Sequence, residues 1–112
     1  MCIKGLSGVF LFLVVVVFYP MQSAGAKNFT AHELLQWPKN KQNSYFQISI
    51  SMAGAIAAQK ESNIGTCIND WYFKDSDIQN QHIRNVMHKY PNFHPSGVIL
   101  AILQKACGPI AE

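Results

Sequence analysis

The chain has 112 residues, of which 49% are hydrophobic and only 13% are charged, with a formal net charge of +3. A chain of this length builds one domain, because a hydrophobic core of this size does not divide. The positive side chains are scattered, with only Lys39 and Lys41 close together. The sequence therefore lacks the basic stripe of nucleic-acid-binding proteins, and we expect no nucleic-acid partner.

Residues 1–26 have the pattern of an export signal. Lys4 supplies the positive start, and an uninterrupted apolar run from Gly8 to Tyr19 follows it. Ala24-Gly25-Ala26 then has the small-x-small form that signal peptidase reads. We predict a cleaved signal peptide over residues 1–26, which directs export, and a single mature domain over residues 27–112.

The apolar run of this leader is too short to cross a bilayer. Its twelve residues fall below the roughly 20 that a spanning helix needs. An uncleaved membrane anchor is the alternative to a cleaved signal, but we expect no stable membrane anchor after cleavage. Cys2 precedes the apolar run, so it is not placed for lipidation, and cleavage removes it.

Two cysteines, Cys67 and Cys107, remain in the predicted mature chain. In a small exported domain, which folds in an oxidising compartment, two cysteines form a disulfide by default. Closing a loop of this length stabilises the folded chain by about 4 kcal/mol in the chain-entropy model. We predict a Cys67–Cys107 disulfide. The alternative, a nucleophilic cysteine, needs a free thiol and a partner histidine.

A short first helix is predicted after Thr30. Thr30 and Glu33 have the spacing of a capping box, in which each side chain accepts a hydrogen bond from the other residue's backbone N–H. Leu34 and Trp37 follow, and Pro38 ends the helix because the residue before a proline avoids helical geometry. We expect Trp37 in the core, with a place at an interface as the alternative.

A long second helix is predicted from about Tyr45 to Glu61, after a polar linker from Pro38 to Asn43. Ser44 and Gln47 have the form of a second capping box. Apolar residues recur every three or four positions, as in a helix with a buried face. They are Phe46, Ile50, Ala53, Ile56 and Ala57, with Tyr45, Ile48 and Met52 widening that face.

Small residues from Ala53 to Ala58 give this helix a surface that another helix can approach closely. The close neighbour is either another part of the same chain or a second subunit. Asn63 and Gly65 follow and are predicted to terminate the helix.

The segment from Thr66 to Asp75 shows neither a helical nor a strand period and is predicted to be a loop. It carries three consecutive aromatic residues, Trp71, Tyr72 and Phe73, which cannot all point inward. At least one is expected to be partly exposed, which makes the loop a candidate recognition surface. The alternative is that the aromatic rings form a lid over one end of the helical bundle.

Ser76 and Gln79 have the form of a third capping box, and a helix is predicted from there to about Tyr90. One side of this helix is apolar. The opposite side is polar and includes Gln81, Arg84 and Asn85. Such a polar face is either simply solvated or makes specific contacts with a partner.

The last helix begins near Pro95, because proline suits the first helical turn, and ends at Cys107, before Gly108 and Pro109. Its apolar residues wrap more than one face, so we expect it to be buried on more than one side. The predicted fold is therefore all-α: a small, four-helix, bundle-like domain linked by the Cys67–Cys107 disulfide.

The sequence shows no motif for catalysis or metal binding. His82 and His88 are separated by about 240° around a helix, so they do not share a face, and a structural zinc site needs close, paired ligands. His94 is interpreted as a helix-start residue. No phosphate-binding loop, Gly-x-Ser-x-Gly motif or spaced pair of carboxylates in an apolar setting is present. We expect a binding or structural module that is not an enzyme and holds no metal or cofactor.

The order of several segments resembles one known family. These segments are Glu33-Leu34-Leu35-Gln36-Trp37, Ala53-Gly54-Ala55-Ile56-Ala57, Cys67-Ile68, Gln81 to Tyr90, Pro95 to Leu103, and Cys107. Together they resemble the immunity proteins of the Tai and Rap group, which protect bacteria from peptidoglycan amidase effectors of the type VI secretion system. The resemblance covers roughly residues 31–109 and consists of a pattern of helices, small residues and two cysteines.

The resemblance implies a periplasmic, all-helical protein, usually a homodimer. Such a protein binds a cognate papain-like amidase that cuts the peptide stems of the cell wall. It fills the cleft that holds the cysteine and histidine of the amidase, so inhibition requires no chemistry from the immunity protein. A few aromatic or arginine side chains inside a polar rim supply the affinity.

Candidate partner-binding residues follow from expected exposure and are not mapped from the family. They are Asp70, Trp71, Tyr72 and Phe73 in the predicted loop, Gln81, Arg84 and Asn85 on the third helix, and Phe93 in the last turn. Two other functions remain open. One is a periplasmic acid-stress chaperone that exposes apolar surface at low pH. The other is a small secreted helical carrier or signal, which typically has an evident ligand cavity.

Overall fold

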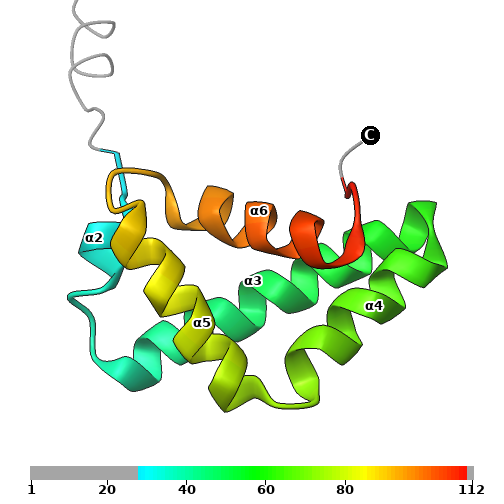
Figure 1. The fold of residues 1–112 in the computed structure, drawn as a ribbon, viewed down its shortest axis with the longest axis horizontal. Coiled ribbons are helices and arrows are strands. Elements are labelled where there is room, and N and C mark those ends of the chain that lie inside the picture. Colours follow the sequence, from blue (N-terminus) through cyan, green and yellow to red (C-terminus); the bar gives the residue numbers. More distant parts are fainter. Residues whose placement is uncertain (1–27, 111–112) are drawn as a thin grey trace, which may run out of the picture.

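The computed structural model describes residues 28–110, which form five α-helices and no strand (Figure 1). The helices are α2 (Ala31–Leu34), α3 (Lys39–Lys60), α4 (Ser62–Phe73), α5 (Ser76–Lys89) and α6 (Pro95–Cys107). The predicted all-α fold is confirmed, with one helix more than expected. The signal peptide predicted over residues 1–26, together with Cys2, lies outside the described residues. Within residues 28–110, no helix combines the length and the apolar character needed to cross a bilayer.

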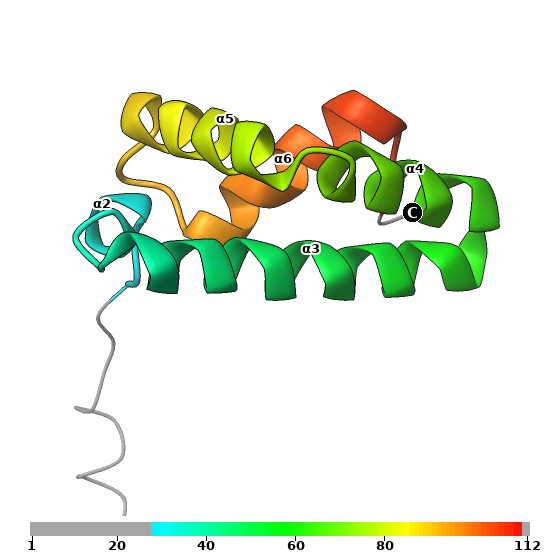
Figure 2. The same cartoon turned by 90° about the horizontal axis from the view of Figure 1, so that it is seen from below.

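The longest helix, α3, runs along one side of the molecule, and α4 folds back beside it (Figure 1, Figure 2). The α5 helix lies across from α3, as the view from below shows (Figure 2). The α6 helix contacts each of the other four helices. Its side chains Val98, Ile99, Ile102 and Leu103 are buried. This confirms the expectation that the last helix is covered on more than one side.

Local side-chain contacts set the starts of α2 and α6, as the sequence predicts. At α2 the Thr30 hydroxyl accepts from the Glu33 backbone N–H at 3.3 Å, and the Glu33 carboxylate accepts from the Thr30 N–H at 3.1 Å. At α6, His94 Nδ1 accepts from the Ser96 backbone N–H at 3.1 Å, and Pro95 is the first helical residue. The first capping box and the helix-start role of His94 are confirmed.

The polar linker predicted from Pro38 to Asn43 is wrong, because α3 already begins at Lys39. The reason is a tertiary contact. The buried side-chain amide of Gln42 donates hydrogen bonds to the carbonyl oxygens of Leu35 and Trp37, at 3.2 and 2.8 Å. These bonds join the end of the short helix to the first turns of α3, so polar residues there belong to the helix.

The other two predicted capping boxes are also wrong. Ser44 lies inside α3, where its hydroxyl donates to the Asn40 carbonyl oxygen at 3.1 Å. At α5 the cap is Asp75, one residue before Ser76, and its carboxylate accepts from the Ile78 backbone N–H at 3.3 Å. A preceding aspartate competes well with serine for this position, because both are favoured helix caps.

The loop predicted from Thr66 to Asp75 is wrong, because most of it belongs to α4. Gly65, Ile68 and Tyr72 are buried on one side of this helix, at helical spacings of three and four residues. A single residue in extended conformation, Glu61, separates α4 from α3. The three aromatic residues thus lie in the last turn of a helix.

Gly65 marks the closest approach between α3 and α4. Predicted together with Asn63 as a helix terminator, it lies instead within α4. A Cβ atom on Gly65 would lie 2.6 Å from the Ala58 Cβ and 2.9 Å from the Gly54 carbonyl oxygen. The small-residue surface of α3 is therefore covered by another helix of the same chain.

The apolar side chains of α3 are divided between two sides of the helix. Phe46 and Ile50 are fully buried, whereas Ile48, Met52 and Ile56 are 63, 60 and 52% exposed. The prediction that these three residues belong to the buried face is wrong, because the other helices cover only one side of α3. They form an outward apolar ridge at successive turns.

Trp37 is 39% exposed, so the expectation that it lies in the core is wrong. The chain turns into α3 immediately after it, and the residues of α2 that reach the core are Ala31 and Leu34. The Trp37 ring stacks on Phe29 with ring centroids 5.4 Å apart. It also meets the edge of the Tyr45 ring at 6.1 Å.

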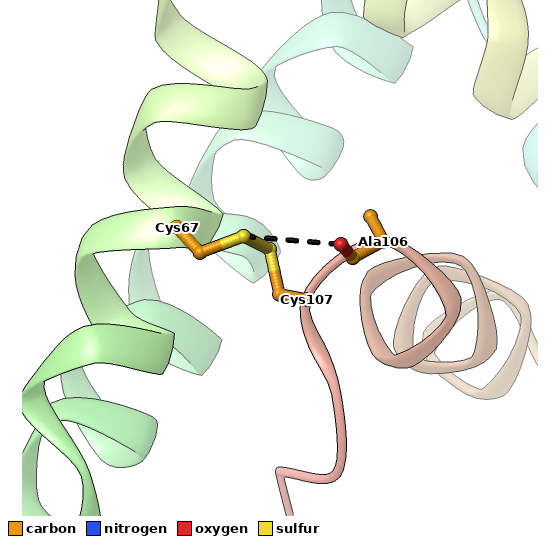
Figure 3. The surroundings of a disulfide bond; sticks show 3 residues. All are labelled: Cys67, Ala106 and Cys107. Atoms are coloured by element: carbon orange, nitrogen blue, oxygen red, sulfur yellow. Dashed lines mark hydrogen bonds between the residues drawn. A yellow bond between two sulfur atoms is a disulfide. The ribbon is translucent and has the colours of Figure 1, made fainter.

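The predicted disulfide is confirmed. It joins Cys67, in the middle of α4, to Cys107, the last residue of α6, across 40 positions of sequence (Figure 3). The Cα atoms lie 5.8 Å apart, within the range that disulfides span. The Cys67 Sγ also lies 3.9 Å from the Ala106 carbonyl oxygen, a contact rather than a hydrogen bond because the bonded sulfur carries no proton (Figure 3).

Replacing Gly65 with alanine is expected to lower the free energy of unfolding by about 1–2 kcal/mol, because the added methyl group overpacks the α3–α4 contact. Gly97→Ala is the matched control, since a Cβ there meets nothing within 4 Å. It is expected to stabilise the protein by up to about 1 kcal/mol, because alanine lowers the conformational entropy of the unfolded chain. Denaturant unfolding measures both variants. Equal stabilisation by the two would contradict the close contact.

The buried Tyr72 hydroxyl donates a hydrogen bond to Asn80 Oδ1 at 2.7 Å. Burial raises the pKa of Tyr72 above its ordinary value of 10.0, although the hydrogen bond to Asn80 opposes the shift. The folded protein therefore holds this proton more tightly than the unfolded chain does. The resulting stabilisation is fully present below pH 10 and is lost as the pH rises beyond it.

Tyr72→Phe is expected to lower stability at neutral pH by about 1–2 kcal/mol, because the buried Asn80 oxygen loses its donor. Above pH 10 the free energy of unfolding should fall more steeply in the wild type than in Tyr72→Phe. Denaturant unfolding at several pH values checks this. Parallel pH curves for the two proteins would rule out a tightly held Tyr72 proton.

Candidate functional site

An open apolar groove of about 890 Å³ lies between α5 and α6. One wall comes from α5 and the other from α6, and a side chain of α4 reaches it as well. The lining residues are Trp71, His82, Val86, Lys89, Tyr90, Phe93, Gly97, Val98, Ala101, Ile102, Lys105 and Ala106. This volume falls within the range of sites that take up small molecules.

The groove exists because each helix has an apolar stripe beside the one that enters the core. On α5, Ile83 and Met87 are fully buried, and a neighbouring stripe formed by Val86 and by Tyr90, which follows the last residue of the helix, lines the groove. On α6, small residues such as the exposed Ala101 face the same space. Because these side chains are short, they leave the groove open.

The turn between α5 and α6 forms one end of the groove and is fixed to α2. The backbone N–H of Ala31 donates to the Phe93 carbonyl oxygen at 2.8 Å, and that of His32 donates to the Pro91 carbonyl oxygen at 2.9 Å. The first N–H groups of a helix have no partner within the helix. Here they donate to carbonyl oxygens of the turn and hold its backbone against α2.

Two large aromatic side chains stand exposed at this turn. Tyr90 is 52% exposed and Phe93 is 62% exposed. Their rings meet edge to face, with centroids 5.9 Å apart. At the other end of the groove, the half-buried Trp71 meets the His82 ring at 6.4 Å, also edge to face. Exposed aromatic residues on a fixed backbone are typical of binding surfaces.

The charged residues of the groove lining are both cationic. Lys89 stands on α5 near the turn, and Lys105 stands on α6 toward its C-terminal end. The lining includes one histidine and no carboxylate. Within residues 28–110, no group of three His, Cys, Asp or Glu side chains lies close enough together to hold a metal ion. The groove is therefore suited to binding an apolar group that carries negative charge.

No family model, curated protein or solved structure matches this chain. The assignment of the site therefore rests on the groove and on the side chains around it.

Two of the predicted partner-binding residues, Trp71 and Phe93, lie in the groove at its opposite ends. Asp70 and Phe73 are exposed on α4 but do not line it. Tyr72 is 1% exposed, so its prediction as a contact residue is wrong: it lies on the side of α4 that packs into the core. The expectation that the three aromatics cannot all point inward is confirmed.

The predicted polar face of α5 lies away from the groove. Gln81 Nε2 donates to Asn85 Oδ1 at 3.0 Å, and Arg84 Nε donates to Gln81 Oε1 at 3.4 Å. Arg84 also donates to Asn43 Oδ1 on α3 at 2.8 Å and lies 5.8 Å from the centre of the Phe46 ring. Arg84 therefore has a packing role between α5 and α3, and Gln81 and Asn85 remain exposed beside it.

Sequence reasoning missed the groove itself. Tyr90 and Val86 have the helical spacing of core residues, and nothing in that spacing separates them from Ile83 and Met87. The sequence does carry one indication of the groove, because the apolar face of this helix is wider than one neighbouring helix can cover. A second contact surface was therefore needed on α5.

Proposed function

We propose that this chain is an exported immunity-type inhibitor, which binds a cognate peptidoglycan amidase and occludes its active-site cleft. The observation that carries the proposal is the turn between α5 and α6, where Tyr90 and Phe93 stand exposed on a backbone fixed by α2. Such a turn can enter a cleft on another protein. The amidase class comes from the resemblance to the Tai and Rap group.

The proposed binding element is ordered before it meets a partner. Two hydrogen bonds from the first turn of α2 hold the backbone around Phe93. Little conformational entropy is then lost on binding. Most of the free energy gained by desolvating the aromatic rings therefore contributes to the affinity. Aromatic side chains dominate the binding energy of many interfaces. No catalytic group is required of this chain.

The disulfide supports the proposed location. Disulfides persist in oxidising compartments, and small exported domains use them to supplement a limited core. A bond between Cys67 and Cys107 fits a protein that works in the periplasm.

The proposed homodimer has a candidate surface on α3. Ile48, Met52 and Ile56 form its outward ridge, and residues 42–59 include no charged side chain. Depletion of charge is typical of the centre of a subunit interface. The ridge lies on the side of α3 away from the helices that it packs against, so a dimer formed there leaves the groove open.

The test uses the purified chain and, one at a time, the cysteine–histidine peptidoglycan amidases encoded by the same organism. We expect a stable complex that blocks peptidoglycan hydrolysis and contains two copies of this chain by light scattering. Phe93→Ser should weaken binding by about tenfold or more, the loss of one aromatic contact of about 1.4–2 kcal/mol. Its thermal stability should remain within about 0.5 kcal/mol of wild type, because the side chain is exposed.

Phe73→Ser is the matched control, because Phe73 is 49% exposed and lies outside the groove. Its affinity is expected to stay close to that of the wild type. If Phe73→Ser loses binding and Phe93→Ser does not, the partner meets the end of α4 and the assignment of the turn is wrong. If no amidase binds but the protein protects unfolded clients at acidic pH, the chaperone function is supported instead.

A further inference from the structure

The groove extends well beyond the aromatic turn that the proposed function uses. From Gly97 to Lys105 it follows about 12 Å of α6, at 1.5 Å per residue. Its far end is formed by Trp71 and His82. A turn that enters a cleft on another protein leaves this far end unoccupied.

The chemistry of the lining is that of a site for an amphiphile. Apolar side chains such as Val86, Val98 and Ile102 form the walls, and the ionic groups among them are lysines without any carboxylate. An apolar chain would be desolvated by these walls, and an anionic head group would be attracted to a lysine. A neutral or cationic amphiphile lacks that second contact.

The head group is assigned to the far end. Three side chains there can each donate a hydrogen bond: Lys105, His82 and Trp71. At the turn the comparable groups are Lys89 and the Tyr90 hydroxyl, beside the exposed ring of Phe93. More donors gather at the far end, and an apolar chain running toward the turn would end against aromatic rings.

We propose that the α5–α6 groove binds a single-chain anionic amphiphile, with its carboxylate or phosphate at Lys105 and its apolar chain between the two helices. Both head groups offer the same chemistry, an anionic oxygen that accepts hydrogen bonds. This inference goes beyond the proposed function, because it requires no amidase and places the head group at the end of the groove away from the turn.

The test follows the fluorescence of Trp71, which lines the groove, in a Trp37→Phe background so that Trp71 is the single tryptophan of residues 28–110. Dodecanoate and dodecyl phosphate, each below its micellar concentration, are the probes. We expect a saturable, one-to-one change with at least one of them, and the stronger probe identifies the head group. Dodecyl maltoside, with the same chain and no charge, should bind at least about tenfold more weakly.

Two lysine variants locate the head group. Lys105→Gln should weaken binding of the anionic probe about tenfold. Lys89→Gln should change it by less than about threefold, because a charge more than one Debye length away is largely screened. If Lys89→Gln has the larger effect, or dodecyl maltoside binds equally well, the proposed recognition of an anion at Lys105 is wrong.

Ala101→Trp fills the groove from an exposed helical position and should abolish binding of the anionic probe. Calorimetry measures this binding, because the variant adds a second indole that would disturb the fluorescence of Trp71. Circular dichroism verifies that the variant is folded. If the wild type gives no saturable binding of either anionic probe, the proposal is overturned. Weaker amidase binding by Ala101→Trp would then assign the whole groove to the protein partner.

Discussion

The bond between Cys67 and Cys107 is the constraint on which the arrangement of the helices depends. It fixes the middle of α4 to the end of α6, and α6 contacts every other helix of the described chain. The other end of α6 follows directly from the turn that carries Phe93. Backbone hydrogen bonds from α2 hold this turn in place. Both ends of α6 are thus fixed, and the wall that it gives to the groove cannot move freely.

A second constraint supports the first. Gly65 lets α4 pack closely against Gly54 and Ala58 of α3. This contact holds α4 on the long helix in addition to the disulfide. Trp71 lies one helical turn after Cys67 on α4 and reaches the groove. The position of Trp71 is therefore set by the same two contacts that fix α4. The walls of the groove are thus fixed at points away from the groove itself.

The fold could be predicted where a local pattern decides it. The Thr30–Glu33 capping box and the His94 cap involve residues close together in sequence, and both formed as expected. The start of α3 could not be predicted, because the amide of Gln42 meets carbonyl groups that only the folded chain brings near. The α4 helix was missed because Gly65, part of its buried stripe, has the sequence signature of a terminator. Likewise, the exposure of Tyr90 depends on how far α5 and α6 lie apart, which no spacing along one helix reveals.

The role of the disulfide can be measured directly by denaturant unfolding of the Cys67→Ser/Cys107→Ser double variant beside the oxidised wild type. The account predicts that the variant, if it folds, keeps its helical circular dichroism at low temperature but loses about 3–4 kcal/mol of unfolding free energy, as expected for opening a loop of 40 residues. A loss below about 1 kcal/mol would contradict the claim, because the helices would then hold their positions without the bond.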